Sequence, residues 1–196
     1  MASYRQLTQA QLILQQGGVI AYPTEAVYGY GCDPDNPDAV ERLLAIKHRP
    51  WQKGLILIAA GIDQIEPLFG PLNQDQQQLL LSSWSAASKT PTTWLIPDPE
   101  NLVPHWIRGR FDSVAIRISH HPVVKRLCNR WGGPLVSTSA NMSGQPPVSN
   151  ELGLRRRVQA LPLWQQPDAI VSGETLGFSK PSEIRDLLTG EVIRSQ

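Results

Sequence analysis

The sequence predicts a single α/β or α+β domain built on a mixed sheet. Short apolar runs typical of buried strands are interspersed along the chain with segments that carry helix caps and an apolar stripe. No break in composition marks a linker and no internal repeat divides the 196 residues. That length suits one domain with a substantial core. The order of the elements along the chain does not determine the order of the strands in the sheet.

The first helix and strand are expected before residue 23. Thr8-Gln9-Ala10-Gln11 has the spacing of a capping box, so it predicts the start of a helix that stops at Gly17-Gly18. Val19–Tyr22 is a short apolar run and predicts a buried strand.

Two helices and a central strand are predicted next. Asn36-Pro37-Asp38 supplies a cap, a first-turn proline and an acid, which together start a helix. That helix ends near Lys47-His48-Arg49, because Pro50 disfavours helix at the residue before it. Leu55–Ala60 is a continuous apolar run typical of a central strand. A Gln-rich helix is expected over Asn73–Ser83.

The middle of the chain predicts two strands and a helix. Thr92–Ile96 is an apolar segment between two prolines. Ser113–Ile118 alternates cleanly, so its valine and isoleucines share one face while Ala115 and Arg117 share the other. Pro122 opens the helix that follows.

The last third begins with a strand and a polar turn. Pro134–Val136 predicts the end of a buried strand, and Ser137–Gly144 predicts a turn of small polar residues. Asn150 caps a helix, and Ala169–Val171 predicts a strand. Glu183–Arg194 predicts a closing hairpin.

Composition restricts the classes of function. The net charge of +1 gives no global electrostatic case for nucleic acid or membrane, so any basic site must be local. Hydrophobic content of 41% and charged content of 18% are typical of soluble globular proteins. Cys32 and Cys128 are too few for a disulfide framework or a Cys-rich zinc site and are expected to be reduced thiols. Without a signal peptide or an apolar run of about 18 residues, we expect a cytoplasmic protein that does not bind a membrane.

The common catalytic motifs are missing from the sequence. Ser139 has no Gly-x-Ser-x-Gly elbow around it, and the four histidines are scattered. No His/Cys pair has metal-ligand spacing, so no metal site is predicted. Neither a Walker phosphate loop nor a Gly-x-Gly-x-x-Gly follows a strand. A nucleotide would therefore have to bind outside the two commonest motifs.

Cationic and small polar groups at the ends of elements remain as candidates, each with an alternative. Ser137–Gly144 is either a ligand-binding turn or an ordinary surface loop. Lys47 and Arg49 converge on one anion if the backbone there is extended, or they are solvated charges at a helix C-terminus. Arg117, on the face opposite the apolar one, binds a ligand carboxylate or phosphate, or it forms a salt bridge to Asp112, Glu25 or Asp186.

Five segments carry a resemblance to a known family, and they occur in that family's order. They are Tyr22–Asp33 with its Pro-Thr-Glu, Lys47–Ala59, Phe111–Arg117, Leu135–Gly144 and Pro181–Gly190. On these segments the chain closely resembles the YrdC-like family, in its short single-domain TsaC form, from about Ile20 to Arg194. The resemblance implies one domain over residues 1–196. It also implies an α/β twisted mixed sheet flanked by helices, with a large positively charged concave surface.

The resemblance also implies an activity, that of threonylcarbamoyl-AMP synthase, a nucleotidyltransferase. Such an enzyme makes L-threonylcarbamoyladenylate and pyrophosphate from L-threonine, bicarbonate or CO2, and ATP. Its product serves the threonylcarbamoyl modification of adenosine 37 in tRNAs that read codons starting with A, through downstream transfer proteins. Mg2+ is expected as the companion of ATP rather than as a caged metal. The concave surface is a possible site for tRNA or double-stranded RNA.

Site residues follow from the matching motif positions. Lys47 and Arg49 match the family's Lys-x-Arg pair and are the expected catalytic residues, acting on the triphosphate. The residues expected to bind threonine or its carbamate are Thr24, Arg117, Ser137 and Ser182. Those expected to bind ATP are Lys47, Arg49, Thr93, Ser139, Asn141 and Arg194.

The chain departs from the family pattern in one place. Lys89-Thr90-Pro91-Thr92-Thr93 stands where the family usually has Pro-Gly-Pro-x-Thr, after an inserted-looking Ser85–Ser88. Thr93 keeps the hydroxyl although the glycine is lost.

The alternative function is an RNA-binding module, for double-stranded RNA, tRNA or ribosome maturation, with a vestigial nucleotide site. Its basic patch would draw on cations that are spread along the sequence. They are Lys47, Arg49, Lys53, Arg108, Arg110, Arg155, Arg156, Arg157 and Arg185.

Overall fold

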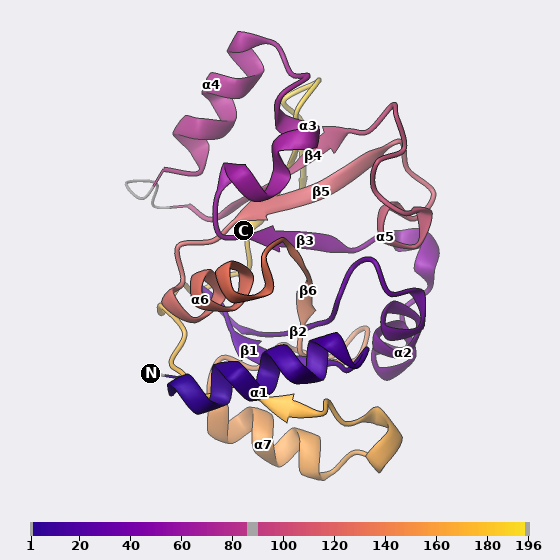
Figure 1. Cartoon of the computed structure of the whole chain (residues 1–196), viewed down its shortest axis with the longest axis vertical. Helices are drawn as coiled ribbons and strands as arrows, with labels where there is room; N and C mark the ends of the chain where they lie inside the picture. Colours follow the sequence, from indigo (N-terminus) through magenta and orange to yellow (C-terminus); the bar gives the residue numbers. More distant parts are fainter. Residues whose placement is uncertain (1, 86–89, 195–196) are drawn as a thin grey trace.

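The computed structural model describes residues 2–85 and 90–194, and within these ranges the chain forms one nine-stranded sheet. Its strand order is β7-β1-β2-β6-β3-β5-β4-β8-β9 (Figure 1). Three neighbouring pairs are parallel, namely β1 with β7, β3 with β5 and β4 with β8, and the others are antiparallel. The predicted mixed sheet is therefore confirmed. The insertion-like residues 86–88 and Lys89 lie outside the described ranges.

The strands are short, and their bounds agree with most of the predicted runs. They are β1 Ile20–Pro23, β2 Tyr28–Gly31, β3 Ile56–Ala59, β4 Thr92–Pro97, β5 Ser113–Ile118, β6 Leu135–Ser139, β7 Ala169–Ile170, β8 Glu183–Asp186 and β9 Val192–Arg194. The α-helices are α1 Tyr4–Gln15, α2 Pro37–Lys47, α3 Glu66–Phe69, α4 Gln74–Ser83, α5 His105–Arg108, α6 Pro122–Trp131 and α7 Glu151–Gln159. None of the helices in the described ranges is long and apolar enough to cross a membrane.

Helices α2 and α7 begin at the asparagine caps that were expected, and α4 also begins after an asparagine cap. Asn36 accepts a hydrogen bond from the Ala39 N–H at 3.1 Å, and Asn73 and Asn150 cap α4 and α7 in the same way. The end of α2 is also confirmed. There His48 adopts a left-handed conformation with φ of 50°, which turns the chain away from the helix axis.

The start of α1 was predicted five residues too late. Ser3, not Thr8, caps this helix, because Ser3 and Gln6 exchange the two hydrogen bonds of a capping box at 3.2 and 3.0 Å. The Thr8 hydroxyl donates back to the Tyr4 carbonyl instead. Two Ser/Thr-x-x-Gln sequences compete here, and the earlier one also places Leu7 on the buried face of the helix.

The Ser137–Gly144 turn was also misplaced, because its first three residues belong to β6. Ser137 pairs with Ile56 of β3, and Ser139 pairs with Gly29 of β2. Both partners are far away in sequence. The turn therefore begins only after Ser139.

The two faces of the sheet carry different coverings. One face packs a large apolar cluster against α2, α4, α5 and α7, and the other packs a smaller cluster against α1 and α6. Alternation along the strands assigns residues to the faces, so Leu57 lies in the first cluster and Ile58 in the second. Helices α1 and α6 cover only part of the second face, toward β1. A cavity occupies the remainder.

Candidate functional site

The cavity has a volume of about 620 Å³ and lies over the central strands. The sheet forms one wall of the cavity. Five residues of this wall are paired directly across five neighbouring strands: Ser137, Ile56, Ala115, Leu95 and Asp186. Directly paired residues point to the same face of a sheet, so the register itself places these side chains in one wall.

Positive charge predominates among all the residues that line the cavity, which together form the cavity wall. Its cations come from five separate segments and are Arg49, Lys53, Arg108, Arg117, Lys180 and Arg194. The wall carboxylates are Glu25 and Asp186. An excess of cations around a concave site favours an anionic ligand.

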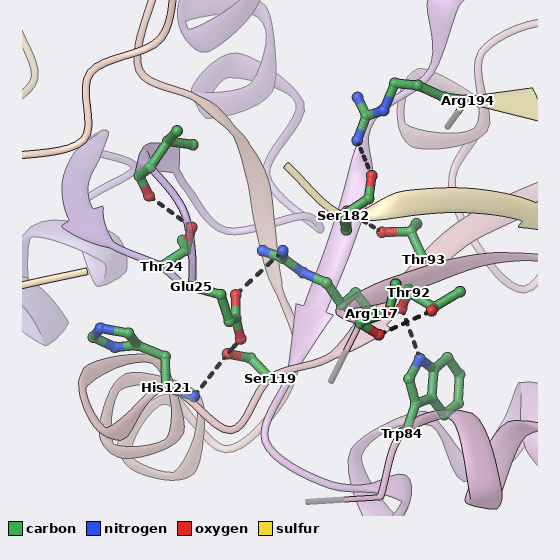
Figure 2. Close-up of polar contacts among 12 residues, drawn as sticks. Thr24, Glu25, Trp84, Thr92, Thr93, Arg117, Ser119, His121, Ser182 and Arg194 are labelled. Atoms are coloured by element: carbon green, nitrogen blue, oxygen red, sulfur yellow. Dashed lines mark hydrogen bonds and ion pairs between the residues drawn. The ribbon is translucent and has the colours of Figure 1, made fainter. Parts of the chain in front are cut away.

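Arg117 projects from β5 into the cavity, on the side that its alternation pattern predicted. It is buried, and its Nη1 lies 3.2 Å from Oε2 of Glu25 (Figure 2). Glu25 is thus the correct one of the three salt-bridge partners considered from the sequence. The guanidinium is not fully used by this pair, because its buried Nε has no hydrogen-bond partner in the described residues.

Glu25 is held by a chain of polar contacts. The Ser119 hydroxyl donates to its carboxylate, and the His121 backbone N–H donates to the Ser119 oxygen at 3.1 Å (Figure 2). Burial alone would raise the pKa of the Glu25 carboxyl. The Arg117 charge and the Ser119 hydrogen bond outweigh burial, so the pKa lies below its usual value.

His121 links this chain to the segment between β7 and β8. Its Nε2 lies 2.9 Å from the Glu174 carbonyl oxygen, and its Nδ1 accepts a hydrogen bond from the Val123 N–H at 3.2 Å. The imidazole therefore caps α6 in its neutral form, protonated at Nε2. Burial lowers the pKa of His121 below its ordinary value, which favours this neutral form.

Lys47 behaves as neither sequence-based alternative expected. Its side chain is buried and donates to the backbone carbonyls of Ser139 and Asn141, the latter at 2.7 Å. Burial, aided by the charge of Arg49, lowers the pKa of Lys47 to about 8. The ammonium is not among the cavity-lining groups. Instead it ties the end of α2 to the turn that follows β6.

Arg49 does reach the cavity wall. Its guanidinium donates to the Gly54 carbonyl at 2.8 Å and to the Lys53 carbonyl at 3.3 Å. The backbone at Gly54 has φ of 62°, and a Cβ there would lie 2.7 Å from the Arg108 carbonyl oxygen. Glycine is thus required where the chain supports Arg49. The structure places Lys47 and Arg49 near one another, but only Arg49 faces the cavity.

The remaining predicted residues divide into two groups. Thr24, Ser137, Ser139, Ser182 and Arg194 join Arg49 and Arg117 in the cavity wall. Asn141 does not line it. Its amide donates to the Met142 and Gln145 carbonyls, while its buried Oδ1 has no hydrogen-bond partner within the described ranges.

Thr93 does not line the cavity but contacts a residue that does. Its hydroxyl is buried and forms a hydrogen bond of 2.8 Å with the Ser182 hydroxyl, which lines the cavity (Figure 2). Arg194 donates to the Ser182 carbonyl at 2.7 Å. Desolvation, with the charges of Arg117 and Arg49, lowers the pKa of Arg194. The β8–β9 hairpin and β4 together therefore fix this side of the cavity.

Five charged wall residues were not predicted as site residues: Glu25, Lys53, Arg108, Lys180 and Asp186. Glu25 had a usable signal, since it directly follows Thr24 and had been considered as a partner of Arg117. Lys53 and Arg108 had been considered only for an RNA-binding patch. Other members of that patch are paired elsewhere, Arg155 with Glu151 on α7 and Arg185 with Glu183.

The arrangement suits binding and charge stabilisation more than acid–base chemistry. Guanidinium and ammonium groups surround a cavity whose other polar groups are hydroxyls. Among the described residues, no cluster of three or more His, Cys, Asp or Glu side chains could hold a metal ion. Fold and cavity together define an α/β protein with a cationic ligand-binding site.

Comparison with known proteins assigns the family. Residues 12–195 match the Sua5/YciO/YrdC family model, described as telomere recombination. The chain belongs to this family. It is 51% identical to the threonylcarbamoyl-AMP synthase of Cellvibrio japonicus over 93% of this chain and 91% of the relative. It is 45% identical to the enzyme of the same name from Vibrio campbellii over 99% of both chains.

A solved structure shows the same fold with a bound amino acid. The structure of P. abyssi Sua5 complexed with L-threonine superposes with a TM-score of 0.80 at 25% identity. The match covers 95% of this chain and 52% of Sua5, so this chain spans about half the length of that protein.

Proposed function

We propose that this chain is a threonylcarbamoyl-AMP synthase, a nucleotidyltransferase that forms L-threonylcarbamoyladenylate and pyrophosphate from L-threonine, bicarbonate or CO2, and ATP. The observation that carries the proposal is the cationic cavity, in which the buried Arg117 retains an unpartnered Nε. Relatives matched along more than nine-tenths of their length carry this name. We propose further that residues 1–196 work as one unit.

The reaction explains why the cavity needs cations. The threonine amine adds to CO2 and loses a proton, which gives a carbamate. A carbamate oxygen then attacks the α-phosphorus of ATP, and the bond to pyrophosphate breaks. Attacking group and triphosphate are both anions, so the site must reduce their repulsion and align them. Mg2+ accompanies ATP as part of the substrate.

We assign roles from the place of each residue in or behind the cavity wall. Arg117 binds the threonine carboxylate or the carbamate, with Thr24, Ser137 and Ser182 around it. The residues assigned to the nucleotide and its phosphates are Arg49, Ser139 and Arg194. Three predicted residues act indirectly, since Lys47 and Asn141 shape the turn after β6 and Thr93 orients Ser182.

The test is an assay of pyrophosphate release by the purified chain. Release should require L-threonine, bicarbonate, ATP and Mg2+ together, and the product should have the mass of threonylcarbamoyladenylate. Single omissions serve as controls, and other amino acids replace threonine in a parallel series. Release that continues without threonine would disprove the proposal. We propose the cytoplasm as its compartment, where the product would pass to proteins that transfer the group to tRNA.

RNA binding is a second candidate, favoured by the rim of the cavity. Arg110 stacks over the Phe111 ring at 5.6 Å, Trp51 is 44% exposed, and Lys53 and Arg108 lie in the adjacent wall. Exposed aromatic and cationic groups together suit bases and phosphates. Affinity for tRNA or double-stranded RNA that falls steeply with salt would support this candidate, and affinity that does not respond to salt would contradict it.

A further inference from the structure

Glu25 divides the cavity into two electrostatically different ends. At one end its carboxylate lies 3.2 Å from the Arg117 guanidinium, so the two charges cancel. At the other end, Arg49 and Lys53 have no carboxylate within ion-pair distance in the described part of the chain. The end at Glu25 and Arg117 is therefore closer to neutral than the end at Arg49 and Lys53.

The neutral end keeps unused polar capacity. Arg117 Nε is buried and has no hydrogen-bond partner among the described residues, and Glu25 Oε2 accepts no hydrogen bond there although it is ion-paired with Arg117 Nη1. One is an acceptor and the other a donor, and both side chains belong to the cavity wall. Buried polar groups are normally satisfied, so such a pair indicates a ligand that brings both a positive and a negative group.

The carboxylate is also held rigidly. Ser119 donates to it, and the Phe178 N–H donates to the Glu25 backbone carbonyl at 3.3 Å. The side chain is 6% exposed in the ion pair. A fixed charge in a poorly solvated position acts strongly on any ion that approaches it.

We propose that Glu25 is a positioning and specificity residue: it fixes the Arg117 guanidinium and cancels its charge, so that this end of the cavity admits a zwitterionic amino acid and excludes phosphate. The inference rests on the proposed function for the identity of the amino acid. An unpaired arginine at this place would attract the phosphates of ATP or free pyrophosphate. With Glu25 beside it, a polyanion meets a negative charge as well as a positive one.

The experiment compares substrates and a competing anion in wild type and Glu25→Gln. Threonine and ATP are varied separately in the pyrophosphate assay, and inorganic phosphate is added as a competitor of threonine. We expect the KM for threonine to rise at least about tenfold while the KM for ATP stays within about twofold. Inhibition by phosphate should strengthen by about tenfold. Equal changes in both KM values, with unchanged inhibition, would overturn the proposal.

Two further variants separate charge from packing. Glu25→Asp keeps the charge and should keep phosphate out, even if the KM for threonine rises. Glu151→Gln removes a carboxylate from an ion pair on α7, outside the cavity, and should change neither KM. If Glu25→Gln does not fold, Ser119→Ala tests the inference instead. This substitution removes the hydrogen bond that holds the Glu25 carboxylate, so the KM for threonine should rise while the KM for ATP does not. An unchanged ratio of the two KM values would count against the inference.

Failure of the proposed function would look different. Wild-type protein that releases no threonine-dependent pyrophosphate would refute the synthase. Calorimetric titration with threonine and with phosphate would then still test Glu25, since the exclusion of phosphate does not depend on turnover. Phosphate that binds equally to wild type and Glu25→Gln at the threonine site would reject the role of Glu25 alone.

Discussion

The Lys47 ammonium lies 2.7 Å from the Asn141 carbonyl oxygen and joins the C-terminus of α2 to the turn after β6. These residues are 94 positions apart in sequence. The contact ties the buried ammonium to the backbone of that turn. Ser143 reinforces the junction, because its N–H donates to the Lys47 carbonyl at 3.0 Å.

We predict that Lys47→Met destabilises the protein. The substitution leaves two carbonyls without their donor, so the free energy of unfolding should fall by about 2–4 kcal/mol. Urea denaturation measures this value. Lys125→Met, at an exposed position on α6, is the matched control and should change stability by less than about 0.5 kcal/mol. Equal stability of the two variants would contradict the buried role of Lys47.

Arg49→Ala should act mainly on ATP. The hydrogen bonds of Arg49 run to carbonyls only four and five residues away, so the loss of stability should be about 1 kcal/mol. Loss of a charge-assisted contact to phosphate should raise the KM for ATP by at least about tenfold.

Arg110→Ala serves as its control, because Arg110 stacks on Phe111 and is not a wall residue. Its KM for ATP should stay within about twofold of wild type. If Arg110→Ala raised the KM for ATP more than Arg49→Ala does, Arg110 and not Arg49 would be the residue that contacts ATP.

Arg117 and Glu25 should be strongly coupled in stability. Arg117→Met leaves the Glu25 carboxylate buried and uncompensated, at a cost of about 3–5 kcal/mol. The double variant Glu25→Gln/Arg117→Met removes that charge, so it should recover part of the loss. A double-mutant cycle from denaturant unfolding gives the coupling energy. Additive effects would show that the ion pair does not contribute as a unit.

Stability should fall in mild acid because of His121. Its folded-state pKa lies below the unfolded value of 6.5, so the unfolded chain takes up the proton first. The contribution of His121 to the free energy of unfolding is thus fully present above pH 6.5 and is lost as the pH falls through and below that value. Protonation at Nδ1 would also break the cap on Val123.

Thermal unfolding between pH 5 and 8 tests this prediction. His121→Asn keeps a capping acceptor that does not titrate in this range, so its stability should depend less on pH. If the melting temperatures of wild type and variant changed with pH in the same way, the pH dependence would belong to other groups.

Local pattern was enough to predict much of the fold. Asparagine caps located the starts of α2 and α7, and the alternation of Ser113–Ile118 placed Arg117 on the correct face. These signals operate within one turn of helix or a few residues of strand. The two capping boxes near the N-terminus show the limit, since only packing of Leu7 distinguishes them.

The features that the sequence did not predict depend on contacts between distant parts of the chain. Whether Lys47 faces the cavity is decided by carbonyls of the turn after β6, and whether Ser137 is strand or turn is decided by its pairing with Ile56. No spacing along the chain encodes such contacts. Most of the residues named from the family resemblance line one cavity, and the resemblance did not specify which of them touch it.

The wall of the cavity includes residues from late in the sequence. Ser182 and Arg194 lie in the β8–β9 segment, and β8 pairs in parallel with β4, about 90 residues earlier. Every strand from β1 to β6 is synthesised before this segment. A nascent chain that ends before Arg194 therefore lacks one cation of the cavity wall.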